Sequence, residues 1–252
     1  MLDFDHVAIA TNGVRPLLRF LTGTLGGVVL SGGSPPGAGF RALQVRIGRA
    51  NAGMTVELLE RWDVEHNDFL ARFLDHTGAG PHHFTFKTKD IVGELARLEE
   101  AGLEPVGVNF DNPAWQELFL HPRQGHGPVI QIAESGFPTV PMAVAIEKAL
   151  AGEVSQWGEP WWNEADAVVG TAAALLERVI IATDDVEGGA AFYRDVLNAS
   201  VTEAPGGLAL RWSGGEIVLE AADVDRPRVD RLEVSNGLWD EKLIEGTRFV
   251  PV

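Results

Sequence analysis

The chain repeats one order of predicted elements three times. In the first copy, a strand-like run, DHVAIAT (residues 5–11), precedes a helical pattern and three further strand-like runs, the last of which is MTVELLE (residues 54–60). The second copy opens with PHHFTFKT (residues 81–88), and the third opens with ERVIIAT (residues 177–183). Repetition at this length predicts a modular fold, in which each module buries its apolar face against other modules.

We therefore expect an α+β fold of paired βαβββ modules. Two complete modules fill residues 1–135, a helical linker spans residues 136–172, and residues 173–252 hold a third module and a truncated fourth. Two helical patterns, VAIEKALAG and EADAVVGTAAALL, flank the tryptophan-rich WGEPWW of this linker. Because such modules leave sheet edges exposed unless they pair, we expect a homodimer.

Composition excludes several classes of partner and site. The net charge of −16 argues against a nucleic-acid partner, because phosphate binding needs a basic face, and it also argues against docking on an anionic membrane. With no cysteine, any metal must be held by nitrogen and oxygen donors. The sequence shows neither a secretion signal at its start nor an apolar stretch that could span a bilayer, so we expect a cytoplasmic protein.

Histidines occur only in the first half of the chain, between His6 and His126. His6 opens the first strand of module 1, and His83 opens the first strand of module 2. The last strand of each module carries an oxygen donor, Glu57 and Gln131 respectively. If the two modules pair about a pseudo-twofold axis, these four side chains converge in a cup. Two imidazoles, a carboxylate and an amide suit a divalent ion such as Zn, Ni, Co, Mn or Fe(II).

Several segments of the first 135 residues resemble the vicinal oxygen chelate superfamily, which includes glyoxalase I, methylmalonyl-CoA epimerase, extradiol dioxygenases and bleomycin-resistance proteins. The segments are DHVAIAT, VELLE, FLDHTGAGPHHFTFKTKDI, FLHP and GPVIQIAE, and their order and spacing match. The stretch Phe73–Ile91, followed by FLHP, is most similar to the epimerase. The resemblance implies the vicinal oxygen chelate fold and places the family's four metal positions at His6, Glu57, His83 and Gln131.

The sequence also departs from that family. The last metal position is usually a glutamate that supplies the base for proton transfer, whereas Gln131 cannot ionise. Glu134 lies three residues further along the strand and should point to the opposite face unless a bulge intervenes. The segment Phe40–Val45, where the epimerase has its other catalytic glutamate, contains no carboxylate. Glu57 is the one carboxylate of the four positions, and we predict that it acts both as metal ligand and as base.

The second half of the chain, with the third module and the truncated fourth, keeps the pattern of elements but loses these side chains. Arg178 stands at the place of His6, Leu219 at the place of Glu57, and Arg231 at the place of His83. Arginine stays protonated and is not expected to bind a metal. We expect the two arginines to have structural or salt-bridged roles, with anion binding as the alternative.

Other histidines are assigned by position. His121 and His126 flank PRQG, a predicted turn near the presumed pocket, so either one contacts substrate or both lie in a solvated loop. His82 should point away from His83, because side chains alternate along a strand, and a structural role is expected for it.

Three functions are compatible with this pattern. The first is a metal-dependent glyoxalase-like isomerase, epimerase or lyase, which acts on a small substrate chelated through vicinal oxygens. The second is an Fe(II)-dependent ring-cleaving or other dioxygenase that uses His6, His83 and Glu57 as a two-histidine, one-carboxylate triad. The third is a metal-free small-molecule binding or resistance protein. Four candidate ligands favour the first over a three-ligand iron site.

Overall fold

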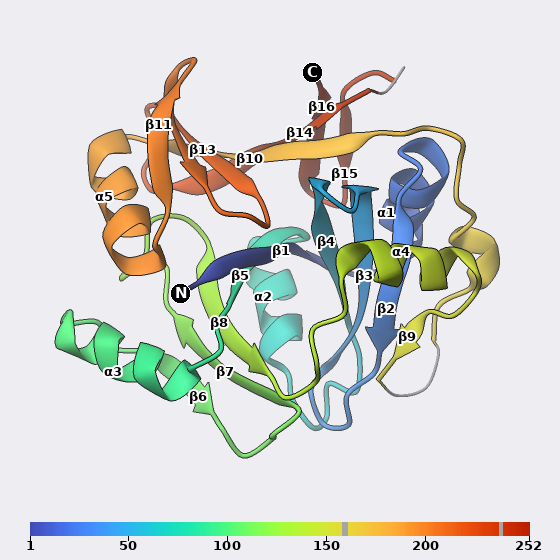
Figure 1. The fold of residues 1–252 in the computed structure, drawn as a ribbon, viewed down its shortest axis with the longest axis horizontal. Helices are drawn as coiled ribbons and strands as arrows, with labels where there is room; N and C mark the ends of the chain where they lie inside the picture. The colour runs from blue at the N-terminus through green and yellow to red at the C-terminus, as the bar shows by residue number, and fades with distance from the viewer. Residues whose placement is uncertain (158–160, 237–238) are drawn as a thin grey trace. The chain divides into compact units, whose positions relative to one another are not determined.

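The computed structural model describes residues 1–157, 161–236 and 239–252 (Figure 1). Parts of WGEPWW and of the truncated fourth module, at 158–160 and 237–238, lie outside the described residues. The chain divides into two compact units. The first unit comprises Met1–His6, His82–Thr139 and Arg178–Arg231, and the second comprises Val7–Pro81, Val140–Glu177 and Leu232–Val252. Both contain mixed sheets with few helices, so the predicted α+β class is confirmed.

The first unit contains most of modules 2 and 3. Each has the predicted order of one strand, one helix and three strands. Module 2 consists of β5 (Gly80–Lys87), α3 (Ile91–Glu100), β6 (Val106–Asn109), β7 (Trp115–Leu120) and β8 (Val129–Ser135). Module 3 consists of β10 (Leu175–Thr183), α5 (Val186–Leu197), β11 (Ser200–Ala204), β12 (Gly207–Arg211) and β13 (Glu216–Ala221), and it is followed by β14 (Arg228–Ser235).

The two modules of the first unit pair their strands in the same way. In module 2 the strand order is β6-β7-β8-β5, and in module 3 it is β11-β12-β13-β10. The last strand of each module is parallel to the first, with Thr85 opposite Gln131 in module 2 and Ile180 opposite Val218 in module 3. Equivalent positions of the modules can therefore be compared residue by residue.

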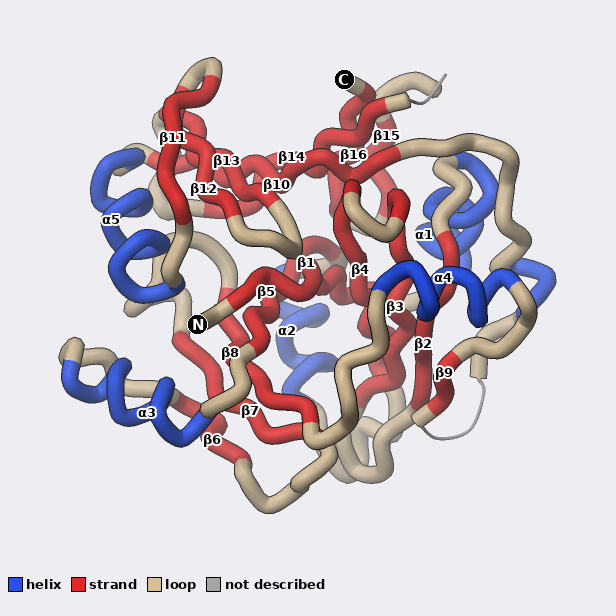
Figure 2. Tube along the Cα trace, viewed as in Figure 1, coloured by secondary structure: helices blue, strands red, loops and turns tan. Residues whose placement is uncertain are grey.

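Helices α3 and α5, blue in Figure 2, begin with the same cap. The carboxylate of Asp90 accepts the backbone N–H of Gly93 at 2.9 Å, and that of Asp185 accepts the N–H of Gly188 at 2.8 Å. An aspartate at this position satisfies one of the free N–H groups of the first turn. Helix α3 packs on β7 and β8, and α5 packs on β11, β12 and β13.

Aromatic side chains fill one face of β5. Phe84 and Phe86 are fully buried. The ring of Phe86 lies 5.4 Å from that of Phe4 and 5.1 Å from that of Trp212, and Trp212 lies 6.1 Å from Tyr193. Because side chains alternate along a strand, this packing turns the other face of β5 toward the polar side chains described below.

The second unit contains the rest of β1 (Asp3–Thr11), which enters it at Val7, and the other elements of module 1. These are α1 (Arg15–Arg19), a π-helical turn η1 (Phe20–Thr24), β2 (Val28–Gly33), β3 (Phe40–Arg49) and β4 (Ala52–Arg61), followed by α2 (Phe69–Thr77). Strands β3 and β4 are antiparallel, with Gln44 opposite Glu57. The unit also holds α4 (Met142–Leu150), β9 (Ser155–Gln156), β15 (Lys242–Ile244) and β16 (Thr247–Pro251).

One of the two predicted linker helices forms. The pattern VAIEKALAG overlaps α4, whereas EADAVVGTAAALL holds no α-helix but the 3₁₀ turn η2 (Glu164–Asp166) and the first two residues of β10. The carboxylate of Asp166 is held by Arg15 and Arg19, and the N–H of Gly170 donates to the carbonyl of Thr22 at 2.9 Å. These contacts hold the segment against α1 and η1, and its helical propensity is overridden. No helix among the described residues is long and apolar enough to cross a lipid bilayer.

Candidate metal centre

Two buried imidazoles lie side by side in the first unit. His6 is 1% exposed and His83 is 5% exposed, and their ring centroids are 5.9 Å apart. When two imidazoles bind one ion through Nε2 at about 2.0–2.1 Å, their centroids are separated by at most roughly 6.4 Å. The two rings therefore lie within the span of one coordination sphere.

The Nδ1 atom of His6 is held by a carboxylate. It lies 2.7 Å from Oδ2 of Asp5, whose other oxygen is 3.1 Å from Nζ of Lys87. Burial opposes the charged form of Asp5, but the hydrogen bond from His6 and the charge of Lys87 keep the pKa of this carboxyl well below its usual range. An ionised carboxylate accepts a hydrogen bond from Nδ1–H, so in neutral His6 the lone pair is on Nε2, the arrangement typical of metal-binding histidines.

His83 has an imidazole partner instead. Its Nδ1 lies 2.8 Å from Nδ1 of His82, so His82 does not point away from His83 as the alternation of side chains predicted. One of these two nitrogens must donate and the other accept; if His83 donates, its lone pair is on Nε2. Burial, reinforced by the nearby His82 and His6, lowers the pKa of His83 well below its ordinary value. At neutral pH His83 is thus uncharged, the form that binds metal ions.

Gln131 lies on the same face as the two imidazoles. It is directly opposite Thr85, whose hydroxyl donates to Gln131 Oε1 at 2.6 Å. The same hydroxyl oxygen is 2.9 Å from Nε2 of His6. Thr85 thus lies between His6 and Gln131 and donates its single hydroxyl proton to Gln131, which leaves the Nε2 lone pair of His6 available, and Gln131 is 7% exposed. The structure thus brings three of the predicted ligands, His6, His83 and Gln131, together with Thr85.

Glu117 is a member of this group that the sequence analysis missed. The amide Nε2 of Gln131 donates to Glu117 Oε2 at 2.7 Å, and the indole N–H of Trp115 donates to the same oxygen at 3.0 Å. Glu117 lies on β7, next to the strand of Gln131, whereas the predicted ligands lie on the first and last strands of modules 1 and 2. The alternation of side chains in WQELFL puts Glu117 and Phe119 on one face of the strand, and this pattern could have predicted the direction of Glu117.

Glu134 faces the other way, as expected for a strand without a bulge there. Its Oε2 accepts the backbone N–H of Ile91 at the start of α3, at 2.9 Å. Glu134 therefore supports a helix and does not replace the missing carboxylate at Gln131.

Glu57 lies on β4 of the second unit. It is buried with 9% exposure, between the fully buried Val56 and Leu58. The next carboxylate on the strand, Glu60, is on the opposite face, where it accepts the N–H of Val14 at 2.6 Å and Nε of Arg41 at 3.0 Å. Of these two buried glutamates, Glu60 thus has a structural role at the start of α1.

The two loop histidines have different surroundings. His121 follows β7 and lines an open cavity of about 450 Å³ together with Arg123 and Glu104. His126 is hydrogen-bonded to Thr183 of module 3, with 2.8 Å between Nε2 and Oγ1. Burial lowers the pKa of His126, although the charges of Asp185 and Asp184 oppose this shift.

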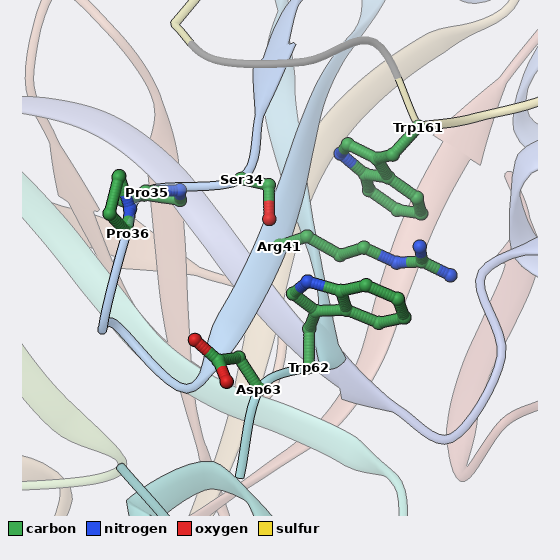
Figure 3. Close-up of a pocket in the computed structure, with 7 residues that line it drawn as sticks. All are labelled: Ser34, Pro35, Pro36, Arg41, Trp62, Asp63 and Trp161. Atoms are coloured by element: carbon green, nitrogen blue, oxygen red, sulfur yellow. The ribbon is translucent and has the colours of Figure 1, made fainter. Parts of the chain in front are cut away.

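The second unit has a separate cavity of about 300 Å³ beside an arginine that is stacked between two indoles (Figure 3). The guanidinium carbon of Arg41 is 4.5 Å from the ring centroid of Trp62 and 4.3 Å from that of Trp161. The indole N–H of Trp161 donates to the carbonyl of Gly33 at 3.1 Å. Arg41 shares the strand face of Glu60, opposite to that of Glu57, so this cavity is not on the Glu57 face of the sheet.

Two arginines, Arg178 of module 3 and Arg231 of the following strand β14, form ion pairs, in agreement with the expected salt-bridged role. Arg231 donates to both oxygens of Glu220, at 2.9 and 2.7 Å, and Arg178 lies 3.9 Å from Glu216. The strand register makes Val218, the residue before Leu219, the counterpart of Gln131.

Comparisons with known proteins agree with this fold. Residues 5–119 match the family model described as Glyoxalase/Bleomycin resistance protein/Dioxygenase superfamily. A hypothetical protein from Staphylococcus aureus aligns over 100% of both chains, with a TM-score of 0.62 and 13% identity. Methylmalonyl-CoA epimerase from Mycobacterium tuberculosis shows 22% identity over 56% of this chain and 91% of its own, with a TM-score of 0.46. A hypothetical protein from Bacillus halodurans shows 24% identity over 55% of this chain and 98% of its own, with a TM-score of 0.47. No match to a curated protein was found.

Proposed function

Residues 5–119 match the model of the Glyoxalase/Bleomycin resistance protein/Dioxygenase superfamily, and on this premise we propose that the protein is a metal-dependent enzyme of the glyoxalase type. The reaction is an isomerisation, epimerisation or lyase reaction of a small substrate that chelates the ion through vicinal oxygens. The observation that supports this most is the pair of buried imidazoles of His6 and His83, at a separation that one ion can span.

We assign the ligand set to His6, His83, Glu57 and Gln131. Asp5 and His82 hold the Nδ1 atoms of the two imidazoles, which favours Nε2 as the ligating atom of both. Glu57 joins the set because it holds the place in module 1 that Gln131 holds in module 2. These nitrogen and oxygen donors suit Zn, Ni, Co, Mn or Fe(II). Such an ion, when bound, supplies a Lewis acid toward the substrate oxygens.

Glu57 is our candidate for the base. It is the carboxylate of the proposed set, and a carboxylate can remove a proton from the carbon next to a substrate carbonyl and return it. The amide of Gln131 does not ionise and so cannot act as a base, and Glu134 accepts the backbone N–H of Ile91 at the start of α3. Proton transfer by a positioned group typically contributes about 10²–10⁴ in rate.

Elemental analysis of the purified protein tests the metal site. We expect close to one equivalent of a divalent ion, and its loss in His6→Ala and His83→Ala. A protein that takes up none of the five candidate ions would contradict the proposal and favour a metal-free binding protein.

Glu57→Gln tests the base. Turnover can be followed as deuterium incorporation from heavy water into a panel of thioesters and α-hydroxyketones. We expect at least about 100-fold slower exchange with the ion retained. Unchanged exchange with unchanged metal content would rule out Glu57 as the base.

A dioxygenase is the second candidate, and one observation favours it. Both polar atoms of the Gln131 amide are hydrogen-bonded to protein groups, which would leave His6, His83 and Glu57 as a triad of two histidines and one carboxylate. Oxygen uptake by the Fe(II)-loaded protein with a catechol separates the two candidates, since an isomerase or lyase consumes no oxygen.

The remaining contacts are proposed on narrower grounds. The cavity at His121 supports this residue as a substrate contact, whereas the bond of His126 to Thr183 favours a structural role.

A homodimer is supported by β6, an edge strand of the first unit with all four residues exposed. Sedimentation equilibrium measures this directly, and a mass of one chain at micromolar concentration would contradict it.

A further inference from the structure

Gln131 differs from the other proposed ligands because its two terminal atoms are not equivalent. A carboxylate can present either oxygen to a cation, whereas an amide presents either a carbonyl oxygen or an NH₂ group, which cannot bind a cation. A glutamine ligand therefore needs a neighbour that fixes which way the amide is turned. In this structure both ends of the amide are hydrogen-bonded.

The neighbour on the NH₂ side is a carboxylate. Glu117 Oε2 lies 2.7 Å from Nε2 of Gln131, and a carboxylate accepts hydrogen bonds without donating any. If the amide turned over, its carbonyl oxygen would face the Glu117 oxygen with no proton between them. The NH₂ group is thus held toward Glu117, and the carbonyl oxygen is held toward Thr85 and His6.

We propose that Glu117 is a positioning residue that sets the orientation of the Gln131 amide and so makes residue 131 an oxygen donor to the cation; this rests on the proposed function. Glu117 is itself fixed. The indole N–H of Trp115 donates to the same oxygen, and Nζ of Lys87 lies 5.3 Å from the centroid of the Trp115 ring. Trp115 and Lys87 thereby restrict the side-chain conformation through which Glu117 acts.

Module 1 provides an internal control for this interpretation. Glu117 is opposite the residue two places after Gln131, and Ala42 is opposite the residue two places after Glu57. Ala42 is thus the counterpart of Glu117. The module with an amide in its last strand has an orienting carboxylate, and the module with a carboxylate ligand, which needs no orientation, has a methyl group in that place.

The experiment measures metal affinity, independent of turnover. The dissociation constant for Co²⁺ and Zn²⁺ is obtained by chelator competition, and the visible spectrum of bound Co²⁺ reports on its ligands. We expect Glu117→Ala to weaken binding by about 10- to 100-fold, as for other groups that orient metal ligands, and to change the Co²⁺ spectrum. Glu117→Gln, which keeps the size but can also donate, should weaken binding less.

The Gln131→Glu background separates orientation from a general structural role. A glutamate at 131 needs no orienting partner, and next to Glu117 it meets a like charge. In this background we expect Glu117→Ala to leave affinity unchanged or to tighten it. An equal loss in both backgrounds, or no loss in either, would overturn the inference.

Glu134→Gln is the matched control, since Glu134 lies on the other face of β8 and bonds to Ile91. We expect it to keep the affinity of the unchanged protein. If Glu117→Ala does not fold, as judged by circular dichroism, the comparison is made with Glu117→Gln in the two backgrounds. Unchanged protein that binds no ion would overturn both the inference and the proposed function. Unchanged protein that binds, with both Glu117 variants binding equally well, would overturn the inference alone.

Discussion

Modules 2 and 3 share a strand register, but equivalent positions on one sheet face hold polar side chains in module 2 and apolar side chains in module 3. Thr85 and Gln131 stand opposite each other and are hydrogen-bonded at 2.6 Å. At the equivalent positions, Ile180 and Val218 form a small apolar cluster with Ala209. The parallel pairing is the same in both modules, so it does not depend on the polar side chains. The fold and the candidate site are specified by different residues.

The charged positions differ in a related way. The first residue of this face is His83 in module 2 and Arg178 in module 3, and Arg178 pairs with Glu216. On β14, the strand that follows module 3, Arg231 binds both oxygens of Glu220. Arg178 brings a permanent positive charge to this face of module 3, whereas His83 brings a neutral imidazole to the same face of module 2, which under the proposed function binds a cation from solution.

The largest expected effect comes from giving module 2 the residue of module 3. His83→Arg replaces a neutral nitrogen donor with a permanent cation, so we expect complete loss of retained metal. Elemental analysis after dialysis measures this. Arg178→Ala is the matched control and should leave metal content unchanged. Equal metal retention by both variants would contradict the role of His83 as a ligand.

The faces that the modules have in common should govern stability. Phe86 and Ile181 are equivalent and fully buried. We expect Phe86→Ala to lower the free energy of unfolding by about 3–5 kcal/mol and Ile181→Ala by about 2–5 kcal/mol. Urea denaturation gives these values. Folded Phe86→Ala should bind metal with unchanged affinity, and a large loss of affinity would show that the two faces are not separable.

A smaller effect is expected when module 3 receives the polar pair. Val218→Gln buries an amide next to Ile180, and we expect it to cost about 1–3 kcal/mol because the amide lacks a partner. Adding Ile180→Thr restores the hydroxyl that Thr85 supplies in module 2. The double variant should therefore lose less stability than the sum of the two single variants, and strict additivity would contradict the pairing.

The smallest effect concerns pH, at the contact of His126 with module 3. Burial lowers the pKa of His126 in the folded state, so below about pH 6.5 the unfolded chain binds more protons and the free energy of unfolding falls. His126→Gln should show a smaller fall between pH 7.5 and pH 5.5 in thermal denaturation. An identical pH dependence in both proteins would contradict this assignment.

The order of elements was predictable from the sequence because it depends on local signals. The alternating runs gave the strands, and Asp90 caps α3 as an N-terminal aspartate should. The position of Glu117 beside Gln131 was not predictable from one segment, because it depends on the register of β7 against β8. The missing linker helix depends on Asp166 and its two arginine partners, which are about 150 residues away in the sequence.

The stacked arginine of the second unit has a practical consequence. Indole emission responds to a nearby charge and to water, and Arg41 lies between Trp62 and Trp161. Loss of this arrangement would change the fluorescence of two tryptophans that belong to the second unit, while Trp115 and Trp212 belong to the first. Variants that keep the tryptophans of one unit and replace the others by phenylalanine would turn these chromophores into separate optical reporters, so that the unfolding of each unit could be timed on its own.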